Sequence, residues 1–306
     1  MDLGSFDQGV YGDPPPELAD IPAGARRFSP LHPGREAIEH AGDSSFGRII
    51  VLAPPGVLER RFVLAHSLRA LAPGGELAAL APKDKGGSRL KKELEAFGCR
   101  VVENARRHHR ICLVQRPATS AGLEAAIAEG GPQVAPRLGL WSQPGVFSWD
   151  RVDPGTALLL ASKLEFAGRG ADFGCGVGVL AQRLLAPPAV ASLALIDIDA
   201  RAIAAARRNI DDPRASVLQH DLRTAPPGLT DLDFVVMNPP FHMGGTEDRS
   251  LGQTFIRRAA AALRRGGVCR LVANIGMPYE AVLAECFSAV APLGQGGGYK
   301  LFEARK

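Results

Sequence analysis

The sequence predicts an α/β protein made of two tandem units, each with a mostly parallel sheet covered by helices. Three observations support this fold class. Short apolar runs alternate with helical patterns along most of the chain. The second half of the chain repeats stretches of the first half, and 306 residues are enough for two domains of ordinary size.

The composition is that of an ordinary globular protein, with 46% hydrophobic residues, 22% charged residues and a net charge of +4. No apolar run reaches the roughly 18 residues that a membrane-spanning helix needs. The N-terminus is acidic and contains three consecutive prolines in place of the basic and apolar stretches of a secretory leader. We therefore expect a cytoplasmic protein that has no contact with a membrane.

The five cysteines are scattered, without a CxxC pair or a neighbouring histidine at ligand spacing. This pattern is typical of reduced thiols and predicts no metal site. The charge balance is only mildly basic, so nucleic-acid binding would depend on local patches rather than on the total charge.

Residues 1–47 are rich in glycine, proline and acids, and we expect an arm or an irregular packing segment with a short helix at 35–40. Residues 48–116 alternate between strand and helix patterns and form the first predicted unit. Its expected strands span 48–53, 75–81, 99–103 and 110–115, and its expected helices span 58–71 and 88–97.

Residues 117–140 are predicted to be a linker with one alanine-rich helix at 120–129, which ends at two glycines and a proline. The alternation then resumes in a longer unit, residues 141–306. Its expected strands span 171–174, 192–197, 216–219, 232–237 and 267–274, with helices near 179–185, 200–209, 253–263 and 278–288.

Two stretches of the first unit match two stretches of the second unit, so the units are predicted to be diverged copies of one fold. The first copy has no glycine-rich turn, and its Ala53 lies where the second copy has Asn238. These differences indicate that the second copy carries the chemistry. The matching stretches are RIIVLAPPG (48–56) with LDFVVMNPPF (232–241), and LAPGGELAAL (71–80) with LRRGGVCRLV (263–272).

A glycine-rich turn, DFGCGVG, follows the first predicted strand of the second unit. Its Gly174, Gly176 and Gly178 allow a tight backbone turn and a close approach to a ligand, and Asp172 precedes them. Val179 lies where the dinucleotide fingerprint GxGxxG requires a glycine, which disfavours the pyrophosphate site of an NAD enzyme. The turn alone fits a ligand loop or a tight structural turn equally well.

Two acidic residues follow the next two predicted strands. Asp197 closes SLALID, where nucleoside-binding α/β folds place a carboxylate for the ribose hydroxyls, and Asp221 follows the strand after it. Either acid alone could belong to a solvated loop. In series with the glycine turn, the two acids favour a bound nucleoside.

A fourth element, Asn238-Pro239-Pro240-Phe241, comes directly after the apolar strand LDFVVM. The prolines remove backbone donors and stiffen the loop, so the Asn238 side chain and the neighbouring carbonyls become fixed acceptors. Two acceptors that converge on one NH₂ group fit the exocyclic amine of a base, and Phe241 offers a stacking face for a base taken out of its helix. The alternative is a strand-terminating turn, and the order of the four elements argues against it.

The ordered set DFGCGVG, LIDID, HD and NPPF resembles the class I S-adenosylmethionine-dependent methyltransferases. The segments NPPFHMGG, GGVCRLVAN, PYEAVL and PGVFSWDRVDPGTALLL resemble the 16S rRNA guanine-N2 methyltransferases of the RsmC type. The resemblance implies two tandem Rossmann-like methyltransferase domains. The N-terminal one, at 48–116, would be degenerate and serve RNA binding or structure. The catalytic one, at 141–306, would have a seven-stranded, mostly parallel sheet.

The resemblance also implies a set of residues around the cofactor, S-adenosyl-L-methionine. The glycine turn would surround its methionine part. Three carboxylates would bind its amino group, its ribose hydroxyls and its adenine amine, in the order Asp172, Asp197 and Asp221. The full expected set is Asp172, Gly174, Gly176, Gly178, Asp197, Asp221, Asn238, Phe147, Asp153 and Thr156.

For the acceptor, the resemblance implies that Asn238 and the Pro239 carbonyl hold the guanine amine, that Pro240 belongs to the same rigid loop, and that Phe241 stacks on the ring. The sulfonium makes the methyl carbon electrophilic, so the protein mainly aligns the amine with it. Accepting both N–H bonds draws the nitrogen towards a more nucleophilic geometry, and no strong general base is required.

Two other functions stay open on the sequence. NPP-type loops also serve other amine acceptors, namely large-subunit rRNA guanine, adenine N6 or protein glutamine. A non-catalytic RNA-binding assembly factor is the second alternative, although the intact motifs of the second unit argue against it. The favoured partner is ribosomal RNA within the small subunit. We expect a monomer, because two linked domains already supply a docking surface and a reaction centre.

Two basic clusters in the first unit are candidates for RNA contact. Interspersed glutamates dilute them, so a solvated charged face is the alternative. The loss of the glycine turn in this copy favours RNA binding, because the domain keeps the fold without the cofactor chemistry. The clusters are Lys83, Lys85, Arg89, Lys91 and Lys92, and Arg100, Arg106, Arg107, His108, His109 and Arg110.

Overall fold

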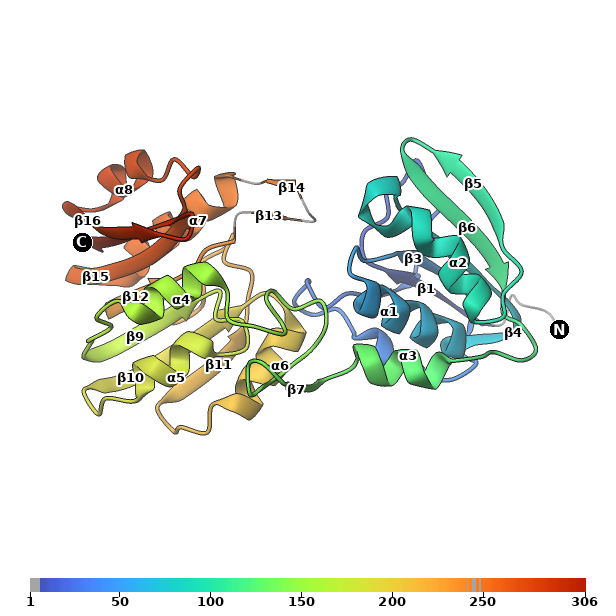
Figure 1. The fold of residues 1–306 in the computed structure, drawn as a ribbon, viewed down its shortest axis with the longest axis horizontal. Helices are drawn as coiled ribbons and strands as arrows, with labels where there is room; N and C mark the ends of the chain where they lie inside the picture. The colour runs from blue at the N-terminus through green and yellow to red at the C-terminus, as the bar shows by residue number, and fades with distance from the viewer. Residues whose placement is uncertain (1–5, 241, 244–245, 248) are drawn as a thin grey trace. The chain divides into compact units, whose positions relative to one another are not determined.

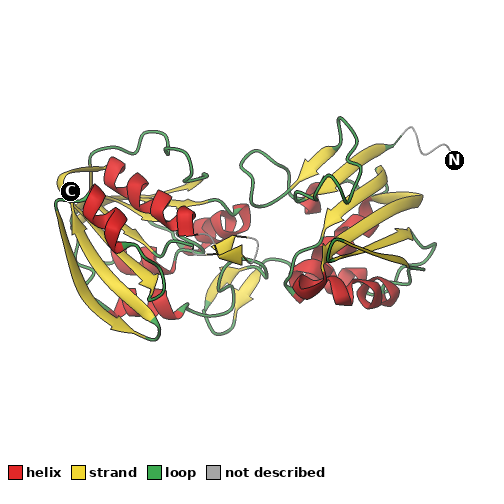
Figure 2. Ribbon diagram, turned by 90° about the horizontal axis from the view of Figure 1, so that it is seen from above, coloured by secondary structure: helices red, strands yellow, loops and turns green. Residues whose placement is uncertain are grey.

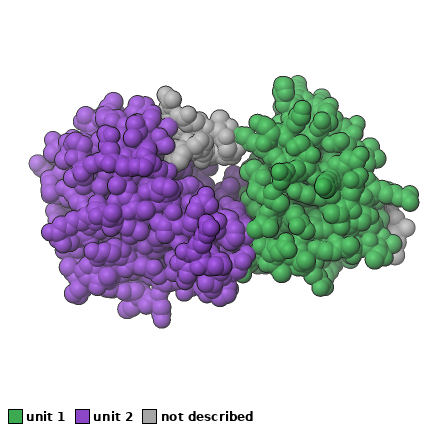
Figure 3. Space-filling model, viewed as in Figure 1, with its two compact units in different colours: residues 1–30, 34–132 green, residues 31–33, 133–306 purple. Residues whose placement is uncertain are grey.

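The computed structural model describes residues 6–240, 242–243, 246–247 and 249–306. It divides into two compact units, Met1–Pro30 with Gly34–Pro132, and Leu31–Pro33 with Gln133–Lys306 (Figure 3). Within the described part of the chain, no helix is long and apolar enough to span a membrane. The same residues contain no group of three or more His, Cys, Asp or Glu side chains that could hold a metal ion.

The first unit contains strands β1 (Asp7–Tyr11), β2 (Arg26–Phe28), β3 (Phe46–Leu52), β4 (Leu71–Pro82), β5 (Val102–Arg106) and β6 (His109–Gln115). Its helices are η2 (Ile38–His40), α1 (Val57–Ala70), η3 (Lys83–Gly87), α2 (Ser88–Ala96) and α3 (Leu123–Gly130). The strands form one sheet in the order β2-β1-β3-β4-β6-β5 (Figure 1). The first four strands in this order are parallel to one another, whereas β6 is antiparallel to β4 and β5.

The second unit is built around a seven-stranded sheet in the order β11-β10-β9-β12-β15-β17-β16. Only β17 runs in the direction opposite to the other six strands, so the predicted mostly parallel sheet is confirmed. The strands of this sheet are β9 (Gly168–Phe173), β10 (Val190–Asp197), β11 (Ala215–Gln219), β12 (Leu232–Met237), β15 (Leu263–Asn274), β16 (Ala289–Gly296) and β17 (Tyr299–Arg305).

Helices cover both faces of this sheet (Figures 1 and 2). Successive side chains of a strand point to opposite faces, so Met237 shares a core with α7 and α8, while Val236 shares a core with α4, α5 and α6. The helices are α4 (Pro154–Ala161), α5 (Val179–Leu185), α6 (Ala200–Asn209), α7 (Arg249–Ala262) and α8 (Glu280–Cys286). Two short strand pairs complete the unit, β7 (Gln133–Ala135) with β8 (Leu140–Ser142) and β13 (His242–Met243) with β14 (Thr246–Glu247).

The N-terminal segment differs from the expected arm. Its strands β1 and β2 extend the first sheet, with β1 parallel to β3. Val10 and Phe28 are fully buried, and the hydrophobic contribution of such side chains stabilises the pairing. Strands of five and three residues within a segment rich in glycine and proline are too short to show an alternating pattern, which is why the sequence did not predict them.

The two sheets repeat one topology. The order β3-β4-β6-β5 in the first unit matches β12-β15-β17-β16 in the second. In each copy a 14-residue helix, α1 or α7, leads directly into a 12-residue strand, β4 or β15. The matched sequence stretches therefore lie at matching places in the two sheets. In this correspondence the Ala53-Pro54-Pro55 loop of the first copy takes the place of the Asn-Pro-Pro loop of the second.

Candidate active site

Three parallel strands end side by side at one edge of the second sheet. Phe173, the last residue of β9, pairs with Ile196 of β10 and with Met237 of β12. The glycine turn, Asp197 and Asn238 follow these three positions and therefore lie next to one another. Ligands of open α/β sheets bind outside the carboxyl ends of the strands, so this edge is the candidate active site.

The glycine turn has a backbone that side chains would strain. Gly174, Gly176 and Gly178 have φ angles of +78°, +53° and +92°, in the left-handed region that favours glycine. The N–H groups of Gly174 and Cys175 both donate to the Ile196 carbonyl, at 2.8 and 2.9 Å, which ties the turn to β10. A Cβ atom at Gly176 would meet no other atom within 4 Å, so the turn borders open space.

Asp197, the last residue of β10, holds the glycine turn in place by a hydrogen bond. One carboxylate oxygen accepts the Gly176 N–H at 2.8 Å, and the other accepts the Asp199 N–H at 2.9 Å. Burial raises the pKa of this carboxyl to about 6, although the backbone donors act in the opposite direction. Each carboxylate oxygen has a further lone pair for a hydroxyl donor. The position is compatible with the predicted ribose contact.

Asp172 is fully buried, and neither of its carboxylate oxygens has a hydrogen-bond partner among the described residues. Burial, and secondarily the charge of Asp197, raises its pKa to about 8. A buried carboxylate without a partner is costly to ionise. A cationic group bound at this edge would lower that cost, so Asp172 is compatible with the predicted contact to an ammonium group.

The Asn238 amide is held in one orientation by α4. Its Nδ2 donates to Asp153 Oδ2 at 2.9 Å and to Thr156 Oγ1 at 3.0 Å. A carboxylate only accepts hydrogen bonds, so the amide nitrogen faces Asp153 and Oδ1 faces the other way. Asp153 is itself fixed, because it caps α4 through the Thr156 N–H at 3.0 Å and accepts the Tyr299 hydroxyl at 3.5 Å. Asn238 therefore presents a lone-pair acceptor rather than a donor.

The remaining predicted site residues are placed less centrally. Pro239 is buried and Pro240 half-buried in the loop after Asn238. Asp221 accepts hydrogen bonds from Arg223 Nε at 2.8 Å and from the Arg223 N–H at 2.9 Å, and this partner lowers the pKa of Asp221.

Two aromatic residues were predicted at the site, Phe147 beside the cofactor and Phe241 on the base. Phe147 is 62% exposed. Phe241 lies outside the described residues. The structure thus gives no geometry for the predicted stacking on the base, and this role stays a prediction.

Tyr299 is the site residue that the sequence did not indicate. It begins β17, and its hydroxyl reaches Asp153 across 146 positions of the chain. A Cβ atom at Gly155 would lie 2.8 Å from the Tyr299 ring, so the close packing of α4 on this ring requires glycine there. The contact depends on tertiary structure alone, and Gly155 beside the capping aspartate was the single local signal.

A mostly parallel seven-stranded sheet with a glycine turn after β9, its first strand in chain order, is the fold of the class I S-adenosylmethionine-dependent methyltransferases, and the chain is an enzyme of this class. The family model described as "Methyltransferase small domain" matches residues 137–303. Together with the relatives described next, this match identifies the particular family. The chain belongs to the ribosomal RNA small subunit methyltransferase C family.

The similarity to these relatives covers both units. "Ribosomal RNA small subunit methyltransferase C" of Pseudomonas paraeruginosa is 33% identical over 281 residues, which span 90% of this chain and 84% of the relative. The Pseudomonas putida protein of the same name is 32% identical over 287 residues, or 90% and 82% of the two chains. The solved "T. Thermophilus 16S rRNA N2 G1207 methyltransferase (RsmC) in complex with AdoMet and Guanosine" is 26% identical with a TM-score of 0.79, and the match covers 98% of this chain and 88% of that chain.

Proposed function

We propose that this protein transfers a methyl group from S-adenosyl-L-methionine to the exocyclic N2 amine of a guanosine in 16S ribosomal RNA. The observation that supports this most directly is the orientation of Asn238, whose Oδ1 is free to accept because Nδ2 is committed to Asp153 and Thr156. The names of the relatives support the RNA substrate. The Thermus thermophilus structure, a complex with AdoMet and guanosine, supports the donor and the base.

The residues at the strand edge fit the cofactor. The partnerless Asp172 carboxylate would accept the ammonium group of the methionine part, beside the open space at Gly176. Asp197 would accept the ribose hydroxyls with the lone pairs that its backbone donors leave. When bound, the cofactor supplies a methyl carbon that its sulfonium makes electrophilic.

The contribution of the protein is to hold the amine in line with that carbon. Asn238 Oδ1 and the Pro239 carbonyl would each accept one N–H of the guanine amine, so the nitrogen lone pair is directed out of the ring plane. Positive charge grows on the nitrogen during transfer, and both acceptors then bind more strongly. The methylated nitrogen is acidic and loses its proton to water, so the site needs no strong base.

Identification of the modified nucleoside tests this proposal. Purified protein would be incubated with isotopically labelled S-adenosyl-L-methionine and either 30S subunits, free 16S RNA or 23S RNA, and the digested RNA would be analysed by mass spectrometry. We expect labelled N2-methylguanosine in 16S RNA, and most of it in the sample of 30S subunits. Label in 23S RNA, in adenosine or in protein would overturn the proposed acceptor and identify another one.

Asn238→Ala is the matched variant for this experiment. We expect it to lower kcat by at least 100-fold, the scale of an oxyanion-hole donor, while the affinity for S-adenosylhomocysteine changes far less. Equal losses in kcat and in cofactor affinity would place Asn238 with the cofactor instead of the substrate.

We also propose that the substrate is the small subunit rather than free RNA, and that the enzyme acts as a cytoplasmic monomer. Comparison of 30S subunits with free 16S RNA in the experiment above measures the first preference. Light scattering of the purified chain measures its mass, and a dimer mass would overturn the second inference.

A further inference from the structure

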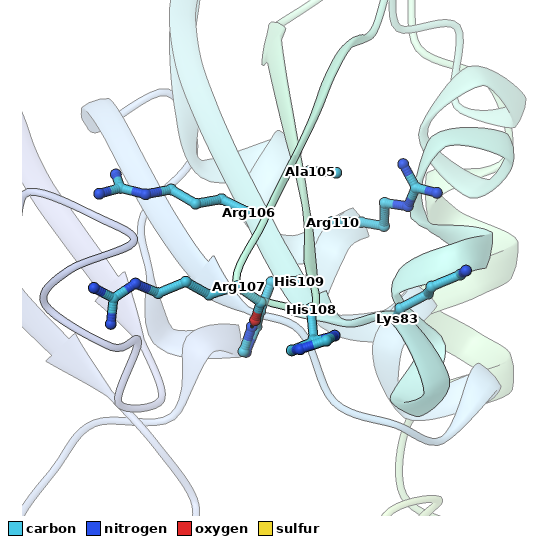
Figure 4. A pocket seen from close by; sticks show the side chains of 7 residues that line it. All are labelled: Lys83, Ala105, Arg106, Arg107, His108, His109 and Arg110. Atoms are coloured by element: carbon cyan, nitrogen blue, oxygen red, sulfur yellow. Dashed lines mark hydrogen bonds between the residues drawn. The ribbon is translucent and has the colours of Figure 1, made fainter.

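The turn between β5 and β6 concentrates positive charge at the surface of the first unit. Three arginines and two histidines occupy the five consecutive positions 106–110. The Lys83 N–H donates to the His108 carbonyl at 2.8 Å and thereby joins η3 to the turn. These residues line a shallow hollow of about 270 Å³ that has no acidic residue in its lining (Figure 4). We call this group the hairpin tip: Lys83, Ala105, Arg106, Arg107, His108, His109 and Arg110.

The cations of the hairpin tip are available for a new partner. Lys83, Arg106 and His108 are exposed and have no side-chain ion pair with the described residues. Arg107 lies 3.4 Å from Glu17, but both side chains are well exposed, at 63% and 43%. Arg110 lies 3.9 Å from Glu103. Ion pairs of this kind on the surface are weak, so an incoming phosphate can replace the carboxylates.

The backbone of the turn gives an independent reason to assign it a function. Arg107 and His108 have φ angles of +46° and +60°, which is the conformation of a two-residue hairpin turn that asparagine and glycine adopt most readily. Residues other than glycine are uncommon in this conformation, and an arginine there strains the backbone. Residues held in such backbone conformations concentrate at functional sites, and here both positions carry basic side chains to the surface.

The directions of the side chains distinguish a polymer from a small anion. Arg106 and Arg107 extend to one side of the hairpin, whereas Lys83 and Arg110 extend to the other (Figure 4). Groups that point apart do not close on one phosphate. They can, however, each reach a different phosphate of a chain in which the charges repeat.

We propose that the hairpin tip binds the phosphate backbone of the substrate RNA. This inference rests on the proposed function for the identity of the RNA. It also favours the second of the two basic clusters of the sequence, because that cluster supplies every basic residue of the hairpin tip except Lys83.

The sharpest test exploits the strain in the turn. The double variant Arg107→Asn/His108→Gly installs the residues that the turn prefers, so we expect a higher Tm than wild type. The same variant removes basic side chains, so its affinity for a 16S rRNA fragment should fall about three-fold or more, with a salt slope smaller by about one. If these two residues had only a structural role, their substitution would not raise the Tm and weaken RNA binding at the same time.

A broader variant and a matched control complete the design. Arg106→Gln/Arg107→Asn/Arg110→Gln should lower the affinity at least ten-fold and raise the KM for RNA while kcat at saturating RNA is retained. Arg27→Gln removes one charge from β2, at the opposite edge of the same sheet, and should leave affinity and salt slope unchanged. Inorganic phosphate at millimolar concentration should not compete with the RNA.

The outcomes separate this inference from the proposed function. If the wild-type protein methylates RNA and the triple variant has the same KM and salt slope, the hairpin tip is not an RNA contact. An equal loss of affinity in Arg27→Gln would overturn it as well, because the effect would then reflect total charge. Wild-type protein that transfers no methyl group but shows tip-dependent RNA binding would overturn the proposed function and support the tip.

Discussion

At the scale of single residues, Asp153 decides which end of the Asn238 amide faces away from α4, the end that the proposed function places against the substrate. We expect Asp153→Ala to lower kcat about 100-fold, because a freely rotating amide misplaces the acceptor, with a smaller change in the affinity for S-adenosylhomocysteine. Asp153→Asn should restore most of the activity, since its own oxygen can still accept from Nδ2. Steady-state kinetics and calorimetry on the two variants measure the difference.

The helix cap is the control for this prediction. Asp153→Ala also removes the N-cap of α4, which costs about 1 kcal/mol of stability, so activity is compared below the onset of unfolding. If Asp153→Asn is as inactive as Asp153→Ala and both lose cofactor affinity in parallel, then Asp153 acts on the cofactor and not on Asn238.

The buried Asp172 makes stability depend on pH. Its pKa in the folded protein, about 8, lies above the ordinary value of 3.8, so the folded protein holds a proton that the unfolded chain has already released. The free energy of unfolding should therefore fall as the pH rises from about 4 to about 8. Asp197, whose pKa is also raised, to about 6, adds to the same trend. Urea denaturation across this range measures the slope, and Asp172→Asn should reduce it.

Cofactor binding should show the opposite trend. An ammonium group beside Asp172 favours the carboxylate, so the affinity for S-adenosylhomocysteine should rise with pH towards 8, and binding below that pH should release a proton. Calorimetry in buffers with different ionisation enthalpies measures the proton directly. Proton uptake on binding, or no proton exchange at all, would show that Asp172 does not contact the ammonium group of the ligand.

At the scale of elements, the Ala53-Pro54-Pro55 loop of the first copy corresponds to the Asn-Pro-Pro loop of the second. Its carbonyl groups are already bound by a buried side chain of the same unit. Arg60 of α1 is fully buried, and its Nη1 donates to the Pro54 and Pro55 carbonyls at 3.0 and 2.7 Å. Its Nε and Nη2 bind Glu93 of α2 in a bidentate pair, each at 2.7 Å. Under the proposed function, the guanidinium takes the place that the substrate amine would take at the second copy. Gly86 packs against it without room for a Cβ atom.

The Arg60–Glu93 pair should therefore be essential for the stability of the first unit. Arg60→Met leaves Glu93 and two proline carbonyls without their donor, and we expect a loss of about 3–5 kcal/mol in the free energy of unfolding. Arg61→Met, on the next position of α1, removes an exposed pair with Glu129 at 3.6 Å and should cost less than about 1 kcal/mol. Similar losses in both variants would argue against this role of the pair.

The elements also show where sequence patterns suffice. The apolar strands β10 and β12 were predicted because burial on both faces leaves a nearly continuous apolar run. Strand β16 was not predicted, since its sequence AVAPLGQG combines proline and glycine and its side chains are mostly exposed at the sheet edge. Helix α4 was also missed, although an aspartate followed by proline is a typical helix start.

The sequence predicts the motifs of the candidate site but not the hydrogen bonds between them. Each motif follows a strand end, and parallel strands bring their ends together, so the sequence order was enough to group the glycine turn, Asp197 and Asn238. The bond from Asn238 to Asp153 joins segments that no local pattern relates. The partners of a polar side chain depend on packing, which is why Asp153 was expected beside the cofactor and the structure shows it bound to Asn238.

At the scale of the whole molecule, each unit has its own hydrophobic cores, with Phe28 and Phe46 in the first and Phe173 and Tyr279 in the second. We expect two thermal unfolding transitions. S-adenosylhomocysteine at about 100 times its Kd should stabilise one of them by about 2.7 kcal/mol and leave the other unchanged. Differential scanning calorimetry measures both, and the Arg60→Met variant assigns the unresponsive transition to the first unit. A single transition that shifts as a whole would contradict this expectation.

The fixed amide of Asn238 has a consequence for how far the reaction proceeds. Unmodified guanosine has two hydrogens on N2, one for each acceptor of the loop, whereas N2-methylguanosine has only one. Under the proposed function, a second round would leave one of the two acceptor oxygens without its donor, and sites built for hydrogen bonds discriminate strongly against ligands that lack the donor. On this proposal the enzyme should release a monomethylated nucleotide and stop there, so the same two acceptors that choose the substrate would also set the product.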